Sequence, residues 1–166
     1  MARRLRLVEL DFAATAPVRL AFTAEVAAPP SAVFRSLAVE LGSMPSWFRA
    51  VASAAPTGGG TGRTVRLRGG VMFRETILAQ DPDTRYAYRI DETNAPGVSA
   101  MVEDWALSPA GSGTRVRWTM AVDGTAPYLF AMRLARPGVG RSFRDAMRRL
   151  DLRLTPARHP SPGTGR

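Results

Sequence analysis

The sequence has 166 residues, a length that suits one domain with a real core, and its 45% hydrophobic and 22% charged content is typical of a globular protein. It contains no cysteine and no lysine, and its one histidine is His159. The absence of cysteine and lysine excludes disulfides, a thiolate nucleophile, Schiff-base chemistry and a Walker-type phosphate loop. His159 lies in a tail rich in Pro, Gly and Ser that is not expected to hold a fixed geometry, so a Ser-His-Asp triad and a His-ligated catalytic zinc have no plausible members. No metal site and no cofactor is expected, so proton chemistry would fall to carboxylates, tyrosine, arginine or water.

The net charge of +9 is unevenly distributed along the chain. Residues 1–132 hold 14 arginines against 12 acidic residues, whereas 133–166 hold 9 against 2. A solvated helix face with a basic tail explains this excess, and binding to an anionic surface is the alternative; specific nucleic-acid binding is not expected. No apolar run reaches the ~18–20 residues of a membrane span. Because charged residues interrupt the N-terminal apolar pattern, no signal peptide is expected and a cytoplasmic location is predicted.

The first 60 residues predict a short extension, a strand and two helices. Residues 1–16 form an N-terminal extension whose apolar residues could pack on the body. Val18–Val26 alternates apolar and polar residues and predicts the first strand. Prolines at 29 and 30 favour a helix start, and Gly42 is expected to end that helix. Met44–Phe48 predicts a second short helix that turns the chain back.

Residues 62–124 predict an antiparallel meander, because five stretches of period-two alternation are separated by short turns rich in Gly, Pro, Asn and Asp. One face is apolar and the other is rich in arginine. The glycine-rich residues 57–62, TGGGTG, lie in front of the meander. Because they precede a strand and not a helix, they predict a hairpin loop and not a phosphate site. The five predicted strands are Arg63–Gly69, Val71–Gln80, Arg85–Glu92, Ser99–Ser108 and Thr114–Asp123.

A long amphipathic helix is predicted to end near Leu154. Its apolar stripe comprises Val139, Phe143, Met147, Leu150 and Leu154, spaced by three and four residues. Pro137 and Gly138 interrupt the pattern, so either the helix is kinked there or two helices meet. Residues 156–166 are predicted to be a disordered tail.

Two local motifs carry a family resemblance: residues 27–34, AAPPSAVF, and residues 107–118, LSPAGSGTRVRW. The first resembles the A-P-P-x-x-V-F/W opening and the second the L-x-P-x-G-x-G-T-x-V-x-W hairpin of the polyketide cyclase/dehydrase family. This family belongs to the START-like superfamily, also called SRPBCC or birch-pollen-allergen-like. The family often has Trp-x-x-Trp in the second helix, where only Trp47 is present here. The similarity covers roughly Pro17 to Leu154.

The resemblance implies an α+β helix-grip fold. In this fold a curved antiparallel sheet of about six to seven strands wraps around a long C-terminal helix, with two short helices after the first strand. Residues 17–155 would form a START-like ligand-binding domain with a deep hydrophobic cavity between sheet and helix. Family members include aromatase/cyclases, lipid and hormone binders, quinone-binding proteins and co-chaperone-like modules, so the motifs indicate the fold more than the reaction.

The inward phase of the strands and helix predicts the lining of that cavity. The alternative is that these side chains simply fill the core, as about half of them must; Trp47 in particular either seals the core or contacts the ligand. The predicted lining is Phe73, Ile77, Tyr86, Tyr88, Met101, Trp105, Val116, Trp118, Met120, Phe143, Met147, Leu150 and Trp47.

Two carboxylates, Glu75 and Glu103, fall in the same inward phase. A buried glutamate is costly unless it is paired or functional. An arginine partner would make each structural; otherwise burial raises its pKa toward working pH and favours general acid/base catalysis. Asp91 and Asp104 fall in the arginine-rich phase, where ion pairs with Arg89 or Arg117 are expected.

Three functions remain open. The first is a cyclase/dehydrase that folds an aromatic or polyketide-like substrate, in which Glu103 or Glu75 removes a proton and Tyr88 hydrogen-bonds an enolate oxygen. The second is a carrier or sensor for a lipid, quinone or similar apolar ligand, without chemistry. The third is a module that binds anionic surfaces through the basic C-terminal end. A monomer or a homodimer suits each of them.

Overall fold

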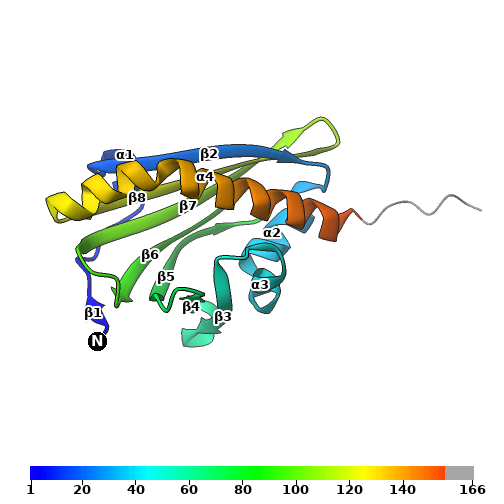
Figure 1. Cartoon of the computed structure of the whole chain (residues 1–166). Helices are drawn as coiled ribbons and strands as arrows, with labels where there is room; N and C mark the ends of the chain where they lie inside the picture. The colour runs from blue at the N-terminus through cyan, green and yellow to red at the C-terminus, as the bar shows by residue number, and fades with distance from the viewer. Residues whose placement is uncertain (156–166) are drawn as a thin grey trace, which may run out of the picture.

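A computed structural model of the chain describes residues 1–155, and the predicted tail, 156–166, lies outside these residues. The eight strands of the described part form one antiparallel sheet with the order β2-β8-β7-β6-β5-β4-β3, and β1 pairs with β6 beside this path. The sheet curves around the long helix α4, and the short helices α2 and α3 close one end (Figure 1). The predicted helix-grip fold is therefore confirmed.

The elements follow one another in a simple order along the chain. The strands are β1 (Arg3–Arg4), β2 (Val18–Val26), β3 (Val51–Thr57), β4 (Gly62–Leu67), β5 (Met72–Asp81), β6 (Arg85–Thr93), β7 (Val98–Ala110) and β8 (Gly113–Gly124). The helices are α1 (Phe12–Thr15), α2 (Pro30–Ala38), α3 (Met44–Trp47) and α4 (Ala126–Leu154), with short 3₁₀ turns η1 (Leu41–Ser43) and η2 (Gly58–Gly60).

Strands β1 and β3 were not predicted, and they raise the number of strands from the predicted six or seven to eight. Strand β3 lies at the sheet edge, contains Pro56 and two adjacent alanines, and shifts register near Val51. Proline is tolerated on an edge strand, where its missing N–H costs no ladder bond. The glycine-rich stretch forms the β3–β4 hairpin turn, and Gly58, Gly59 and Gly60 have positive φ there.

The helices also differ in detail from the prediction. Helix α2 ends at Ala38, and Gly42 falls instead in the 3₁₀ turn that leads into α3. Helix α4 runs without interruption through Pro137, so the two-helix alternative is wrong. Pro137 is exposed, and the helix continues although proline cannot donate a backbone hydrogen bond to the preceding turn.

Helix α4 packs closely on the edge strand β2. Gly140, the position of closest approach, is buried, and a Cβ built on it would lie 2.9 Å from a ring carbon of Phe22. Phe22 in turn contacts the rings of Trp118 and Phe143, with centroids 5.9 and 6.0 Å away. The absence of a side chain at residue 140 therefore brings α4 down onto the aromatic core.

The two faces of the sheet bury different sets of residues. The concave face and α4 enclose the main core, which includes Trp47, Tyr86, Ile90, Phe143 and Leu150. On the convex face the N-terminal segment forms a smaller cluster: Val8, Phe12 and Ala16 cover Ala100, Val102 and Ala121. Residues 8–16 thus pack on the outside of the sheet, whereas Leu5 belongs to the main core.

Ion pairs occupy much of the convex face. Asp91 pairs with Arg89, as expected, at 2.9 Å. Asp104 pairs with Arg85 on β6 at 2.8 Å instead of with Arg117 on β8, although both arginines lie opposite Ala106 on the neighbouring strands. No helix within residues 1–155 is long and apolar enough to cross a membrane.

Candidate functional site

A cavity of about 270 Å³ lies between the concave face of the sheet and helices α3 and α4. Most of its wall is apolar, and a small group of polar side chains from β4, β5, β6 and β7 is part of it. Its full lining is Met44, Phe48, Ala50, Val51, Arg63, Val65, Leu67, Phe73, Glu75, Tyr88, Ala95, Val98, Met101, Glu103, Trp105, Trp118, Met120, Tyr128, Met132, Val139 and Ser142.

The first polar group at the cavity is a buried ion pair, Arg63 with Glu75. The two residues are direct partners in the β4–β5 ladder, and each is 3% exposed. The Nε–H of Arg63 donates to Oε2 of Glu75. The guanidinium also lies over the ring of Tyr88, with Cζ 3.8 Å from the centroid, and 5.3 Å from that of Tyr86. A carboxylate and two aromatic faces thus stabilise a cation that burial would otherwise disfavour.

The second polar group centres on Glu103. Tyr88 is its direct partner across the β6–β7 ladder, and the Tyr88 hydroxyl donates to Oε2 of Glu103 at 2.6 Å. The same oxygen accepts a bond from Nε1–H of Trp118 at 2.9 Å. Nε1–H of Trp105 donates to the Tyr88 hydroxyl oxygen at 3.1 Å. Neutral donors therefore satisfy Glu103, whereas a cation satisfies Glu75.

Burial dominates the protonation of both carboxyls. It raises the pKa of Glu75 to about 7, and the attraction of Arg63 only partly opposes this shift. Burial also raises the pKa of Glu103, against the hydrogen bond from Tyr88 and the attraction of Arg63. The pKa of Tyr88 lies well above its usual value because of burial, so its hydroxyl keeps its proton. A carboxyl group that holds a proton near neutral pH has the protonation chemistry of a general acid or base.

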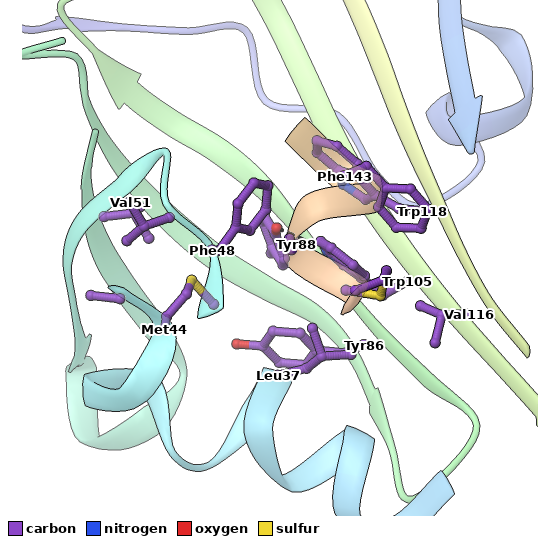
Figure 2. Close-up of a cluster of buried hydrophobic side chains, with 14 of the residues drawn as sticks. Leu37, Met44, Phe48, Val51, Tyr86, Tyr88, Trp105, Val116, Trp118 and Phe143 are labelled. Atoms are coloured by element: carbon purple, nitrogen blue, oxygen red, sulfur yellow. Dashed lines mark hydrogen bonds between the residues drawn. The ribbon is translucent and has the colours of Figure 1, made fainter. Parts of the chain in front are cut away.

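The apolar part of the cavity contains a cluster of aromatic rings. The indoles of Trp105 and Trp118 stack with centroids 5.1 Å apart and planes 18° apart. Phe48 meets both in an edge-on arrangement, and Phe143 stacks on Trp118 at 5.9 Å. Figure 2 shows Phe48 on the far side of Tyr88 from Tyr86, and Phe143 beside Trp118 where α4 passes. Such rings favour flat apolar guests.

The structure brings about half of the predicted lining residues to the cavity. Phe73, Tyr88, Met101, Trp105, Trp118 and Met120 line it, together with Glu75 and Glu103. The others fill the core beside it or pack against that core. These are Ile77, Tyr86, Val116, Phe143, Met147, Leu150 and Trp47. Trp47 is fully buried, and its Nε1–H has no hydrogen-bond partner among the described residues.

The prediction did not include Arg63 among the site residues. The sequence does contain a pattern that would have predicted Arg63 as a site residue. Arg63 shares the inward phase of β4 with Val65 and Leu67. An arginine in that phase, one short hairpin before an inward glutamate, predicts a buried pair. The α4 residues Tyr128 and Met132 were also missed, because they precede Pro137 and lie outside the predicted apolar stripe. Val139 was predicted as part of that stripe but not as part of the cavity lining.

A second, larger depression of about 1040 Å³ lies on the convex side. Small residues such as Ala13, Ala21 and Ala106 line it together with Thr119. Its rim carries arginines from three strands and from α4: Arg19, Arg85, Arg117, Arg133 and Arg136. This arginine-rich surface therefore differs chemically from the apolar cavity. Within residues 1–155, no group of three or more His, Asp or Glu side chains is placed to hold a metal ion.

The comparisons with known proteins agree with this geometry. The family model described as polyketide cyclase / dehydrase and lipid transport matches residues 17–155. Uncharacterized proteins from Mycobacterium tuberculosis strain H37Rv and Mycobacterium bovis are each 33% identical over 156 residues, which cover 91% of this chain and 92% of theirs.

Solved structures with the same fold come from bacteria and plants. The protein XoxI from Bacillus cereus aligns with a TM-score of 0.69 and 17% identity over 86% of this chain and 99% of its own. A START superfamily protein from Mycobacterium smegmatis aligns with 0.65 and 14% identity, over 82% and 96%. The major latex-like protein 151 of Panax ginseng aligns with 0.66 and 12% identity, over 84% and 98%. At these identities the likeness shows the fold alone.

Proposed function

Because the chain belongs to the family of polyketide cyclases, dehydrases and lipid-transport proteins, we propose that it binds a small hydrophobic molecule in the cavity between the sheet and α4. The observation that carries the proposal is the cavity itself, an apolar space with one cluster of polar groups, which is the usual form of a ligand site. Its volume lies near the lower limit of the ~300–1,000 Å³ typical of ligand pockets. The ligand we propose is therefore a compact aromatic, polyketide-like or lipid-like molecule.

Filling the cavity from α4 tests this proposal. Met132 lines the cavity, whereas the neighbouring Ala131 is exposed on the same helical turn. We expect Met132→Trp to weaken the binding of an apolar fluorescent probe at least tenfold and Ala131→Trp to leave it unchanged. Probe titration with thermal denaturation of both variants provides the measurement. Equal probe affinity of the two folded variants would place the binding site elsewhere.

A second candidate function is catalysis of the cyclase or dehydrase type in the same cavity. The observation in its favour is a carboxyl group, Glu103, that lines an apolar cavity with a raised pKa. The hydrogen bonds from Tyr88 and Trp118 both engage Oε2 of Glu103, so the other oxygen is the one we assign to proton transfer. Glu75 is held by Arg63, and the Tyr88 hydroxyl both donates and accepts. We therefore assign Tyr88 to positioning Glu103, and a bond to an enolate oxygen would require it to exchange partners.

Glu103→Gln separates an enzyme from a carrier, because the amide keeps the size of the side chain but loses the transferable proton. In an enzyme, turnover of a cyclase-type substrate should fall by ~10²–10⁴ with probe affinity unchanged. In a carrier, the same change should be neutral or stabilising. Glu25→Gln on the exposed part of β2 is the control. Unchanged product formation in both Glu103→Gln and Glu75→Gln would exclude these carboxyls as the catalyst.

We also propose a cellular context for this function. A cytoplasmic protein that acts as a monomer or a homodimer and that binds no specific nucleic acid fits a carrier, a sensor and an enzyme equally. The alternative of an anionic-surface module draws on α4, where Phe130 and Leu134 are exposed beside Arg133 and Arg136. Sedimentation with anionic and neutral vesicles tests it, and pelleting with anionic vesicles alone is the result that would support it.

A further inference from the structure

We infer that the cavity selects compact apolar molecules that carry one carboxylic acid group, that Arg63 holds this group, and that binding takes up one proton from solution. This inference rests on the proposed function, since it specifies the ligand of the same cavity. It begins from a feature that neither a solid core nor a purely apolar pocket requires: a guanidinium group in the cavity wall.

Arg63 is fixed in place before any ligand arrives. Its residue is 3% exposed, its Nε–H is bonded to Glu75, and its guanidinium plane lies over the ring of Tyr88 at 3.8 Å. A guanidinium has five N–H donors, and the bond to Glu75 uses the Nε–H. The terminal nitrogens carry the remaining four donors, whose fork matches the two oxygens of a carboxylate. A ligand that carries a carboxylate therefore complements the charge and the N–H donors of Arg63 in this wall.

The rest of the wall defines the body of the ligand. Phe73, Met101, Trp105 and Trp118 present rings and a thioether, and the polar groups lie together on the β4–β7 side. A ligand that fits such a wall has one polar end and an apolar, flat remainder. The volume of about 270 Å³ suits a body of one or two fused rings.

A count of charges predicts the coupling to protons. One guanidinium and two carboxyls, Glu75 and Glu103, share the cavity, so the group is neutral when one carboxyl holds a proton. A bound carboxylate adds a negative charge to a poorly hydrated space, where an uncompensated charge is very unfavourable. Neutrality then requires a second proton, and the second carboxyl is the group that accepts it.

The other groups around Glu75 leave this count unchanged. From β6, Tyr86 and Tyr88 face it as neutral phenols, and Asp91 lies on that strand hydrogen-bonded to Thr76 and paired with Arg89. From α4, Tyr128 lines the cavity, and its pKa is raised to about 12 by burial. The pKa of Glu75, raised to about 7, places its proton uptake near neutral pH.

Calorimetry with two matched ligands tests the inference. The probes are 2-naphthoic acid and its neutral analogue 2-naphthalenemethanol, each titrated at pH 6, 7 and 8 in two buffers of different ionisation enthalpy. We expect the acid to bind at least tenfold more tightly than the alcohol at pH 6, where Glu75 already holds its proton and little uptake occurs. Proton uptake should rise toward one at pH 8, and the affinity for the acid should weaken by up to tenfold per pH unit above 7, because the uptake sets this slope. The affinity for the alcohol should stay nearly constant.

A double variant locates the effect at Arg63. Arg63→Met/Glu75→Met removes both partners, because removing one alone would strand a buried charge. We expect it to lose the preference for the acid and the proton uptake but to keep binding the alcohol. Arg66→Met, at an exposed position of the same strand, is the control and should behave as the parent protein does.

Each outcome decides between the two proposals. Equal affinity of the parent protein for acid and alcohol, or an acid preference that survives in the folded double variant, overturns this inference and leaves apolar binding in place. Failure of both ligands to bind the parent protein overturns it together with the proposed function. Should the double variant not fold, the comparison of the two ligands and the proton count in the parent protein decide alone.

Discussion

The two buried carboxyls are stabilised by different means, although they lie on neighbouring parts of one sheet. Glu75 has the full charge of Arg63 beside it, and Glu103 has the hydroxyl of Tyr88 and the indole of Trp118. A buried ion pair is costly to break from one side, because the remaining charge stays unpaired. Hydrogen bonds from neutral groups tolerate either protonation state of the carboxyl more readily. Glu103 is thus the more adaptable of the two, and Glu75 is the more constrained.

Protonation of Glu75 should make stability depend on pH. The folded state raises its pKa from 4.5 to about 7, so the folded chain binds this proton more tightly than the unfolded chain between those values. The free energy of unfolding should therefore be highest below pH 4.5 as far as this group is concerned. It should fall by about 3 kcal/mol as pH rises through 7. Urea denaturation at pH 5, 6 and 7 measures this decline.

The matched variants for this measurement are Glu75→Gln and Glu25→Gln. The first should flatten the decline between pH 5 and 7, although Arg63 then lacks its partner and overall stability is lower. The second, on the exposed part of β2, should keep the decline of the parent protein. The same slope in the parent protein and in Glu75→Gln would show that Glu75 does not titrate in this range.

Strand phase allowed the sequence to predict part of the site. Glu75 and Glu103 alternate with the apolar residues of the inward phase, so the period of two predicts their inward direction. Strand phase does not predict which inward residues reach the cavity, because the same phase includes residues at the cavity and residues in the solid core. Ile77 and Val116 share the inward phase yet lie away from the cavity. Where α3 and α4 leave space depends on packing in three dimensions, which the period of a single strand does not contain.

At the scale of elements, the contact of α4 with β2 determines how the helix crosses the sheet. Gly140 is the point of contact, and Phe22 fills the space that a side chain at residue 140 would need. Two residues earlier, Gly138 has no atom within 4 Å of a built Cβ. Both glycines lie in the same helix, so their intrinsic helix propensities are equal and only their surroundings differ.

The same substitution at these two glycines should therefore have opposite effects. Gly140→Leu should lower the free energy of unfolding by about 1–3 kcal/mol, because the added side chain overlaps Phe22. Gly138→Leu should raise it by about 0.5–1 kcal/mol, since leucine favours the helix and meets only solvent. Chemical denaturation of both variants provides the measurement. A loss of similar size at both positions would mean that α4 does not approach β2 through residue 140.

The elements that the sequence predicted are those with strong local patterns. Strand β8 alternates large apolar residues with arginines, and both its existence and its bounds were predicted closely. Strand β3 consists largely of small residues with a proline, and its pairing with β4 is a tertiary effect that no local pattern reports. Likewise, Pro137 predicts a break from local rules, but packing of the helix on both sides of it keeps α4 continuous.

At the scale of the whole molecule, the excess of positive charge lies in one segment of the chain. Acidic partners neutralise several arginines of the sheet, among them Arg85 and Arg89, and Glu25 pairs with Arg115 on the edge hairpin. Residues 133–166 carry the excess, with 9 arginines against 2 acidic residues. Such an excess gives a general attraction to anions, which salt screens, and it provides no pattern that reads a nucleic-acid sequence.

Truncation after Thr155 tests how much this excess matters. The deletion removes residues 156–166 and two of the nine arginines, Arg158 and Arg166. We expect unchanged thermal stability and unchanged affinity for an apolar probe. Binding of duplex DNA to the full chain, measured by fluorescence anisotropy, should be weak and should disappear at physiological salt, because counterion release dominates it. Tight binding that resists salt and depends on sequence would instead favour the surface-binding function.

The stacked indoles of Trp105 and Trp118 also give the protein a spectroscopic signal of its own. Two of its three tryptophans are in the cavity wall, 5.1 Å apart, and the third, Trp47, is fully buried nearby. Indoles this close couple their electronic transitions, so the near-ultraviolet circular dichroism should contain a contribution from the pair. A guest that inserts between or against the rings would change their separation or angle and alter that contribution. Occupancy of the cavity can thus be followed optically in unlabelled protein, even for a guest that neither absorbs nor fluoresces.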